Sequence, residues 1–245
     1  MKLTHANLLT TGNPKTLKGE TDGYFTAVLH LAPSTLSGKN VCPFATAACI
    51  FGCLNHAGRG GIFKKGEITN AIQLARIART NWYHDNRADF LLNLERAITL
   101  HVKRAKQNGL TPCIRLNGTS DLSIENWGIL ERFPDVQFYD YTAVPKRTFD
   151  FANHKLPENY HLTFSRKETP LNHTAAKLAL KRGVSVAVVF DTKKGAPLPS
   201  QFWGKPVIDG DLSDLRFRDD RGVIVGLRAK GKKAKADTTG FVVLV

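Results

Sequence analysis

Apolar and polar residues follow two different periods along the chain, and these periods predict strands and helices. The run 24–32 is rich in β-branched and aromatic residues and stops at Pro33, as a strand does. Apolar residues then recur at helical spacing over 68–82 and again over 90–105, and Gly109 supplies a stop signal. Residues 1–22 are polar and glycine-containing, so we expect an irregular lead-in before the first strand.

Beyond residue 110 the pattern alternates regularly. Short apolar runs predict strands at 112–117, 136–141, 161–165, 184–190, 205–209 and 223–227, and helical patterns lie between them at 123–133, 146–153 and 171–181. Such alternation is typical of parallel strands joined by crossover helices. We therefore expect a single α/β domain over residues 1–245, either a partial (β/α) barrel or an open, mostly parallel sheet.

Length and composition agree with this fold class. A chain of 245 residues can bury one full core, and 42% hydrophobic with 23% charged residues is typical of a soluble protein. No segment is apolar enough for a signal sequence or a membrane span, so we expect a cytoplasmic protein with no membrane partner. A reducing compartment disfavours disulfides and favours metal ligation by cysteine. The oligomeric state stays open.

Three of the four cysteines fall within twelve residues, at Cys42, Cys49 and Cys53, in a loop directly after the first predicted strand. Thiols so close in sequence are typical ligands of one soft metal centre. Zinc sites favour two separated Cys/His pairs, and no second pair follows here. Three thiols in one loop instead suit a 4Fe–4S cluster with one iron left for another ligand. The sequence does not decide whether the fourth ligand is an external molecule or His56. Cys113 is expected to be a buried apolar residue.

Polar residues also occur where the predicted strands stop. In a parallel α/β fold the carboxyl ends of the strands carry the functional site, and the cysteine loop leaves one of these ends. The residues expected to line a substrate pocket there are Asn117, Thr119, Ser120, Asp121, Ser165, Arg166 and Asp191. The alternative is that these residues are ordinary turn formers at strand ends.

The charge balance points to a polyanionic partner. The formal net charge is +14, and phosphate contacts from lysine and arginine give affinity that depends little on sequence. The residues expected to contact nucleic acid are Lys167, Arg228, Lys230, Lys232, Lys233 and Lys235. Because no helix resembles a major-groove reader, we expect single-stranded DNA, with bases stacking on aromatic residues such as Trp82, Tyr83, Tyr139 or Trp203. The alternative for the basic tract 228–235 is a mobile, solubilising loop.

Several of these motifs together resemble the gene-88-product family of phages and plasmids. They are the segments 36–43 and 53–60 around the cysteines, Leu-Asn-Gly-Thr-Ser-Asp at 116–121, Gly-Leu-Arg-Ala-Lys at 226–230, and Gly240 with the two residues after it. The resemblance spans most of the chain. It implies a mobile-element origin, hence the host cytoplasm, and it implies no particular activity.

The cysteine loop after the first strand is also similar, more distantly, to that of the radical S-adenosylmethionine (SAM) enzymes. There three thiolates hold a 4Fe–4S cluster and SAM binds the fourth iron. That superfamily spaces its cysteines by three and two residues, whereas six and three residues separate them here. The resemblance implies SAM as a cofactor and the polar strand ends as its pocket.

Three functions follow from these observations. The first is an iron–sulfur protein that acts on nucleic acid, by radical-SAM-like chemistry if it is an enzyme. The second is a non-catalytic single-stranded DNA-binding protein in which the cluster is structural. The third is a binding protein stabilised by zinc.

Overall fold

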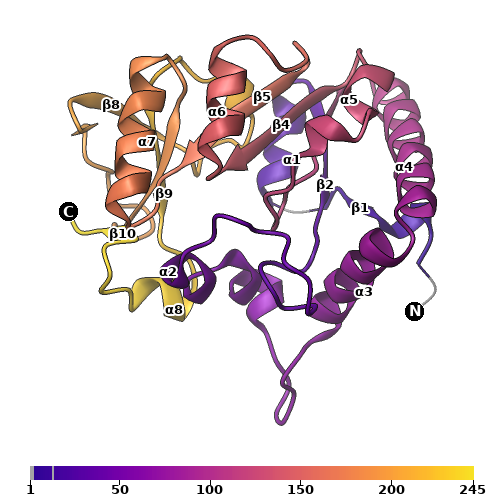
Figure 1. Ribbon diagram of the computed structural model, residues 1–245, viewed down its shortest axis with the longest axis horizontal. Helices are drawn as coiled ribbons and strands as arrows, with labels where there is room; N and C mark the ends of the chain where they lie inside the picture. The colour runs from indigo at the N-terminus through magenta and orange to yellow at the C-terminus, as the bar shows by residue number, and fades with distance from the viewer. Residues whose placement is uncertain (1–2, 13) are drawn as a thin grey trace. The chain divides into compact units, whose positions relative to one another are not determined.

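The computed structural model describes residues 3–12 and 14–245, and over these residues it shows a mixed α/β fold with an open, mostly parallel sheet (Figure 1). The strand order is β1-β2-β3-β4-β5-β6-β9-β8-β7, and β10 pairs with β6. The strands are β1 (Leu9–Thr10), β2 (Tyr24–Leu29), β3 (Thr111–Arg115), β4 (Gln137–Thr142), β5 (Tyr160–Ser165), β6 (Val186–Phe190), β7 (Gln201–Phe202), β8 (Lys205–Asp209), β9 (Ile224–Arg228) and β10 (Val242–Val243). The open-sheet alternative is therefore the observed one.

The helices differ greatly in length. The α-helices are α1 (Pro14–Thr21), α2 (Ala47–Phe51), α3 (Ala71–Asp85), α4 (Arg87–Gln107), α5 (Ile129–Arg132), α6 (Pro145–Ala152), α7 (Pro170–Lys181) and α8 (Gly231–Lys235). Short 3-10 helices are η1 (His5–Asn7), η2 (Leu54–His56), η3 (Gly58–Gly61), η4 (Ile124–Asn126) and η5 (Arg216–Arg218). The chain divides into two compact units, the first comprising 1–43, 63–140 and 157–161, and the second 44–62, 141–156 and 162–245. The expectation of a single domain stays a prediction.

In the first unit, β2 and β3 pair in parallel and α4 packs along them. Phe90, Leu94 and Ile98 are fully buried on one face of α4, as the four-residue spacing of its apolar positions requires. Further along the same helix, His101 Nε2 lies 2.9 Å from the carbonyl oxygen of Phe25 on β2. The core of this unit thus holds α4 against β2 and β3.

In the second unit, β6 is the central strand. It pairs in parallel with β5, β9 and β10, and its valines pack against the alanine-rich face of α7. Thr169 caps the start of α7 with Pro170 at its first position, and Gly183 follows the helix with a φ of 77°. These local signals explain why a helix is predicted here with nearly the observed bounds.

Other segments differ from the sequence-based expectation. The lead-in contains helix α1 and the short strand β1, which pairs antiparallel with β2, so the cysteine segment follows the second strand. The helix expected over 123–133 is split into η4 and α5 at Gly128, which has a φ of 70°. Ser123 makes no side-chain cap to η4. Interruption by a left-handed glycine therefore overrides the apolar spacing of this segment.

Candidate metal centre and basic surface

The cysteine segment is built from short helical turns. Thr46 caps α2 by accepting the backbone N–H of Cys49, Gly52 ends the helix, and Cys53 precedes η2. Cys42, Cys49 and Cys53 are reduced thiols of intermediate exposure, whereas Cys113 is completely buried on β3. The expectation of a buried Cys113 is confirmed, and the three clustered cysteines are reachable by a ligand.

Cys42 lies in the first unit, where two backbone segments hold its sulfur. The backbone N–H of Ser34 donates to Cys42 Sγ at 3.2 Å, and the sulfur lies 3.8 Å from the carbonyl oxygen of Thr119. The Thr119 hydroxyl donates to the carbonyl of Leu31 at 2.6 Å. Thr119, predicted to line a pocket, therefore links the loop after β3 to the segment that carries Cys42.

The rest of the 116–121 motif is a buried hydrogen-bond network. The backbone N–H of Asn117 donates to Asp140 Oδ1 at 2.7 Å, and Ser120 Oγ donates to Asn117 Oδ1 at 2.8 Å. The backbone N–H of Asp121 donates to the carbonyl of Val41, the residue before Cys42, at 2.8 Å. Asn117, Ser120 and Asp121 are all buried. These predicted pocket residues thus support the backbone next to Cys42.

Gly118 is required by the same close approach. A Cβ at this position would lie 2.6 Å from Val28 Cγ1 and 2.7 Å from the carbonyl oxygen of Leu29. The backbone N–H of Gly118 donates to that same carbonyl at 3.0 Å. A side chain at position 118 would therefore push the motif away from the end of β2.

In the second unit, the residues after β5 hold Cys49. The Lys167 ammonium donates to Cys49 Sγ at 3.0 Å. The hydroxyl of Thr46 donates to Glu168 Oε2 at 2.8 Å, so the first turn of α2 is tied to the same segment. Cys53 Sγ accepts the backbone N–H of Asn55 at 3.5 Å. Lys167, predicted to contact nucleic acid, is thus a direct neighbour of a candidate ligand.

The other three predicted pocket residues also belong to the second unit. The guanidinium of Arg166 is buried and donates to the carbonyls of Gly240 and Phe241 at 2.7 and 3.0 Å. Burial lowers the pKa of Arg166 from its ordinary value. Ser165 accepts, through its carbonyl, the side-chain amide of Asn172 at 3.3 Å. Asp191 is exposed and accepts the backbone N–H of Val245 at 3.1 Å. Arg166 and Asp191 therefore secure the segment around β10.

The chemistry of the thiols fits a metal–thiolate centre. Each of the three sulfurs accepts an N–H, and hydrogen bonds to ligating sulfur are one control on the potential of an iron–sulfur cluster. Among the residues that the structure describes, no group of three or more His, Cys, Asp or Glu side chains is placed to hold a metal ion. Because ligand sets commonly form together with metal binding, ligation by the three cysteines stays a prediction.

His56 is close enough in sequence to Cys53 to compete for the fourth position. Burial, followed by the nearby charge of Lys233, lowers the pKa of His56 from its ordinary value. Its imidazole is therefore neutral at pH 7, the form that coordinates metals. A role as ligand stays a prediction.

The basic tract is only partly available to a partner. Arg228 ends β9 and its Nη1 lies 2.9 Å from both carboxylate oxygens of Asp209, while its Nη2 donates to the carbonyl of Ala196 at 2.7 Å. Lys230 pairs with Asp211 at 2.8 Å. These two cations are engaged within the protein. Lys232, Lys233 and Lys235 are exposed on α8 instead, so this part of the tract is a helix and not an irregular loop.

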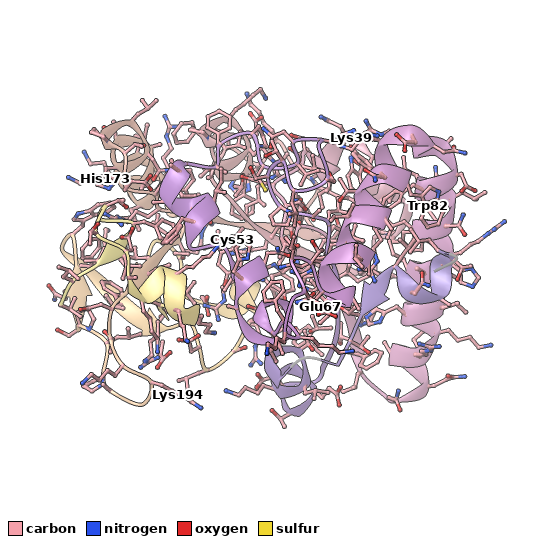
Figure 2. The ribbon with its side chains drawn as sticks, turned by 90° about the horizontal axis from the view of Figure 1, so that it is seen from below. Lys39, Cys53, Glu67, Trp82, His173 and Lys194 are labelled. Atoms are coloured by element: carbon pink, nitrogen blue, oxygen red, sulfur yellow. The ribbon has the colours of Figure 1, made fainter. Side chains whose placement is uncertain are left out.

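Helix α8 packs directly on the cysteine segment, and Figure 1 shows it beside α2. A Cβ at Gly52 would lie 3.4 Å from Ala234 Cβ, and Ala234 is buried. The Lys233 ammonium lies 5.5 Å from the centroid of the half-exposed Phe51 ring. Cys53, which is labelled in Figure 2, comes two residues after Phe51 in the sequence. Sequence reasoning missed Phe51, although its position between two candidate ligands was a usable signal.

The aromatic residues proposed as stacking platforms do not all qualify. Tyr83 and Tyr139 are buried at 7% and 0% exposure, so the expectation that they are exposed is wrong. Tyr83 packs instead among Phe90 and Trp127. Trp82 donates its indole N–H to Asp89 at 2.8 Å, and Trp203 lies beneath the ammonium of Lys177. Tyr83 and Tyr139 are therefore core residues, and Trp82 and Trp203 are each engaged by another side chain.

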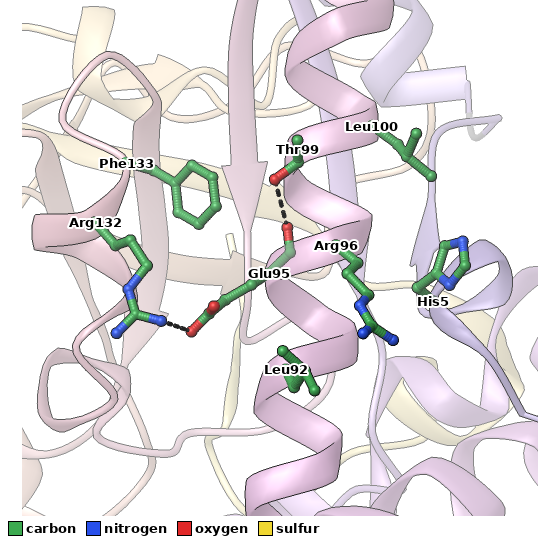
Figure 3. A pocket seen from close by; sticks show the side chains of 8 residues that line it. All are labelled: His5, Leu92, Glu95, Arg96, Thr99, Leu100, Arg132 and Phe133. Carbon is green, nitrogen blue, oxygen red and sulfur yellow. Dashed lines mark hydrogen bonds and ion pairs between the residues drawn. The ribbon is translucent and has the colours of Figure 1, made fainter.

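A shallow pocket in the first unit lies along α4. Figure 3 shows the side chains that line it, with Arg132 paired to Glu95 and the Thr99 hydroxyl donating to the carbonyl of Glu95 at 2.9 Å. None of the predicted site residues lines this pocket. Sequence and structure thus give it no link to the cysteines.

Within the described residues, no helix combines the length and apolar character that crossing a membrane requires.

Comparison with known proteins identifies the family. No curated protein and no solved structure matches the chain. The family model described as gene product 88 matches residues 6–244, which confirms the resemblance carried by the cysteine segment and the later motifs. The chain therefore belongs to the gene product 88 family.

Proposed function

We propose that this protein holds an iron–sulfur cluster on Cys42, Cys49 and Cys53 and binds single-stranded nucleic acid on the adjoining basic surface. The observation that carries the proposal is the packing of α8 on the cysteine segment, through Gly52 and Ala234. This contact joins exposed lysines to the residues between two candidate ligands. A cluster on these thiols would supply a fixed covalent anchor for a segment made of very short helices.

The choice of iron over zinc rests on the ligand set. Zinc requires four protein ligands in a closed structural site, and the loop offers three thiols of intermediate exposure. A cubane cluster accepts three thiolates and leaves one iron for His56 or an external ligand. The Lys167 ammonium at Cys49 also suits a cluster, because its positive charge offsets part of the negative charge of a thiolate-bound centre.

The binding surface comprises Phe51 and the exposed lysines of α8, Lys232, Lys233 and Lys235. The lysines would contact phosphates, and the half-exposed ring of Phe51 would stack with a base. The net charge of +14 favours a polyanion over a neutral partner. A short helix with a ring beside it offers no recognition element for a duplex groove, so an unpaired strand is the better ligand.

The hydrogen bonds of the predicted pocket favour binding over catalysis. Asn117, Ser120 and Arg166 are buried, and their polar groups form hydrogen bonds with other parts of the protein. A SAM or substrate pocket needs polar groups that face a ligand. The cluster in this proposal is therefore structural, and incubation with SAM and a low-potential reductant should yield no 5′-deoxyadenosine. Formation of that product would instead establish the radical-SAM-like activity.

Titration of labelled DNA tests the binding half of the proposal. Protein purified without oxygen is titrated into a labelled oligothymidylate and into a duplex of equal length, each at two salt concentrations. We expect tighter binding to the single strand and a steep loss of affinity with salt, because phosphate contacts release counterions. Absence of binding to either DNA at low salt would contradict the proposal.

A further inference from the structure

Basic side chains gather at the carboxyl ends of β2 and β3 in the first unit. Arg115 is the last residue of β3 and is aligned with Val28 of β2, which in turn is aligned with Thr10 of β1. His30 follows two positions after Val28, and side chains two positions apart along an extended segment share a face. Arg115 and His30 therefore lie on one face, at the edge of the parallel strands where α/β proteins bind ligands.

Helix α3 adds two more arginines to this edge. Arg76 and Arg79 are one helical turn apart, so they lie on the same side of α3. Arg79 is buried and donates to the carbonyl of His30 at 3.4 Å and to the carbonyl of Asn7 at 2.7 Å. The backbone N–H of Ala32 donates to Thr80 Oγ1 on the same helix at 2.8 Å. These bonds fix α3 beside the end of β2, and Arg79 acts as the anchor.

Electrostatics at His30 agree with this geometry. Burial, followed by the positive charges of Arg76, Arg115 and Arg79, lowers the pKa of His30 to about 3. The imidazole is therefore neutral at physiological pH. The Thr10 hydroxyl lies 3.2 Å from His30 Nδ1 and adds a second neutral polar group. Positive charges from Arg76, Arg79 and Arg115 thus gather around a neutral imidazole.

We propose that this cluster is a binding site for a phosphate group, with Arg76 and Arg115 as its direct ligands and Arg79 as a positioning residue. Arginine presents a planar set of N–H donors that matches phosphate oxygens, and partial burial strengthens such contacts. Arg76 and Arg115 are of intermediate exposure, so a ligand can reach them. The phosphate would belong either to a free nucleotide or to a nucleic-acid backbone. The site does not depend on the iron–sulfur cluster.

Calorimetry with pyrophosphate tests the site. We expect saturable binding by the full-length protein, weakened about tenfold in Arg76→Gln and in Arg115→Gln, because each variant removes a charge-assisted pair. Arg104→Gln makes the same charge change on an exposed position of α4 and should bind as the wild type does. The His30 pKa, followed by nuclear magnetic resonance, should rise when pyrophosphate binds.

Two further arms distinguish the sources of the phosphate. A nucleoside 5′-monophosphate that competes with pyrophosphate identifies a nucleotide site, and an oligothymidylate without terminal phosphates that competes identifies a backbone site. Should Arg115→Gln fail to fold, Arg115→Lys retains the charge but not the planar set of donors, and weaker binding is still expected. No saturable binding of pyrophosphate, or equal weakening in Arg104→Gln, would overturn the proposal.

Discussion

The ammonium group of Lys167 donates a hydrogen bond to the sulfur of Cys49, with an Nζ–Sγ distance of 3.0 Å. This contact connects the segment after β5 to α2, where Thr46 and Glu168 make a second connection. A positive charge at a ligating sulfur stabilises the more negative, reduced state of a cluster. The contact therefore gives a direct electrochemical prediction.

Replacement of Lys167 by Met should lower the reduction potential of the proposed cluster, on the order of tens of millivolts, because the donor and its charge are both lost. Lys167→Arg retains the charge and should preserve most of the potential. Lys181→Met, at an exposed position of α7, is the matched control. Spectroelectrochemical titration of the three variants checks this, and equal potentials in wild type and Lys167→Met would contradict it.

The lysines of α8 should set the salt dependence of DNA binding. The triple variant Lys232→Gln, Lys233→Gln, Lys235→Gln should bind single-stranded DNA more weakly and with a shallower salt dependence, by roughly 0.7 in slope for each lost contact. The control changes three exposed lysines of the same unit to Gln, at positions 155, 181 and 194. Fluorescence anisotropy at several salt concentrations measures both slopes. An unchanged slope in the α8 variant would exclude helix α8 as the binding surface.

Phe51 should contribute through stacking and not through charge. Phe51→Ala should weaken DNA binding roughly tenfold while leaving the salt dependence unchanged, because base–ring stacking contributes about 1–3 kcal/mol. Leu54→Ala removes a similarly exposed apolar side chain nearby and serves as the control. The same anisotropy titrations separate the two effects. A change in slope instead of affinity would be inconsistent with stacking.

Asn117 should stabilise the first unit through its buried network. Asn117→Ala leaves the buried carboxylate of Asp140 without donors from this side chain, and we expect a loss of about 2–4 kcal/mol in the free energy of unfolding. Asn93→Ala, on the exposed side of α4, should change it by no more than about 0.5 kcal/mol. Urea unfolding followed by circular dichroism measures both. Equal free energies of unfolding for Asn117→Ala and wild type would show that the network does not hold the 116–121 segment.

Asp219 should make the second unit less stable as the pH rises. Burial raises the pKa of Asp219 to about 6, above the ordinary value of 3.8, although Arg216 lies 3.1 Å away. Between pH 3.8 and about pH 6, the Asp219 carboxyl is therefore protonated in the folded state but ionised in the unfolded state. This contribution is complete below pH 3.8, declines as the pH rises through 6, and amounts to about 3 kcal/mol at most.

The variant Asp219→Asn should remove this part of the pH dependence, whereas Asp220→Asn, at an exposed position, should leave most of it. Urea unfolding of the three proteins between pH 4 and pH 8 makes the comparison. A wild-type curve parallel to that of Asp219→Asn would disprove the assignment.

The long elements of the fold were predictable from sequence because each carries a complete local signal. Helix α7 has a threonine cap, a proline at its first turn and a glycine after its end, and three of the five residues of β6 are valine. The short elements gave no such signal. Helix α2 spans five residues, too few for a periodic pattern, and β10 depends on pairing with β6 far away in sequence.

The candidate ligands can be named from the sequence, but their surroundings cannot. Cys42, Cys49 and Cys53 are visible as a sequence cluster, whereas the role of Asn117 depends on its tertiary contact with Asp140. The sequence likewise suggests that Arg228 is a surface cation, and only the structure shows its pairing with Asp209. A polar residue at a strand end is the same in sequence whether it faces a ligand or a neighbouring loop. Only the fold distinguishes these cases.

The iron and acid-labile sulfide content of protein purified without oxygen tests the central claim most directly. We expect a brown protein with about four irons per chain, as a cubane cluster requires. Single replacements of Cys42, Cys49 and Cys53 by Ser should each abolish stable iron binding, and Cys113→Ala should retain it. Full iron content in any of the first three variants, loss of iron in a folded Cys113→Ala, or bound zinc in place of iron would contradict the account.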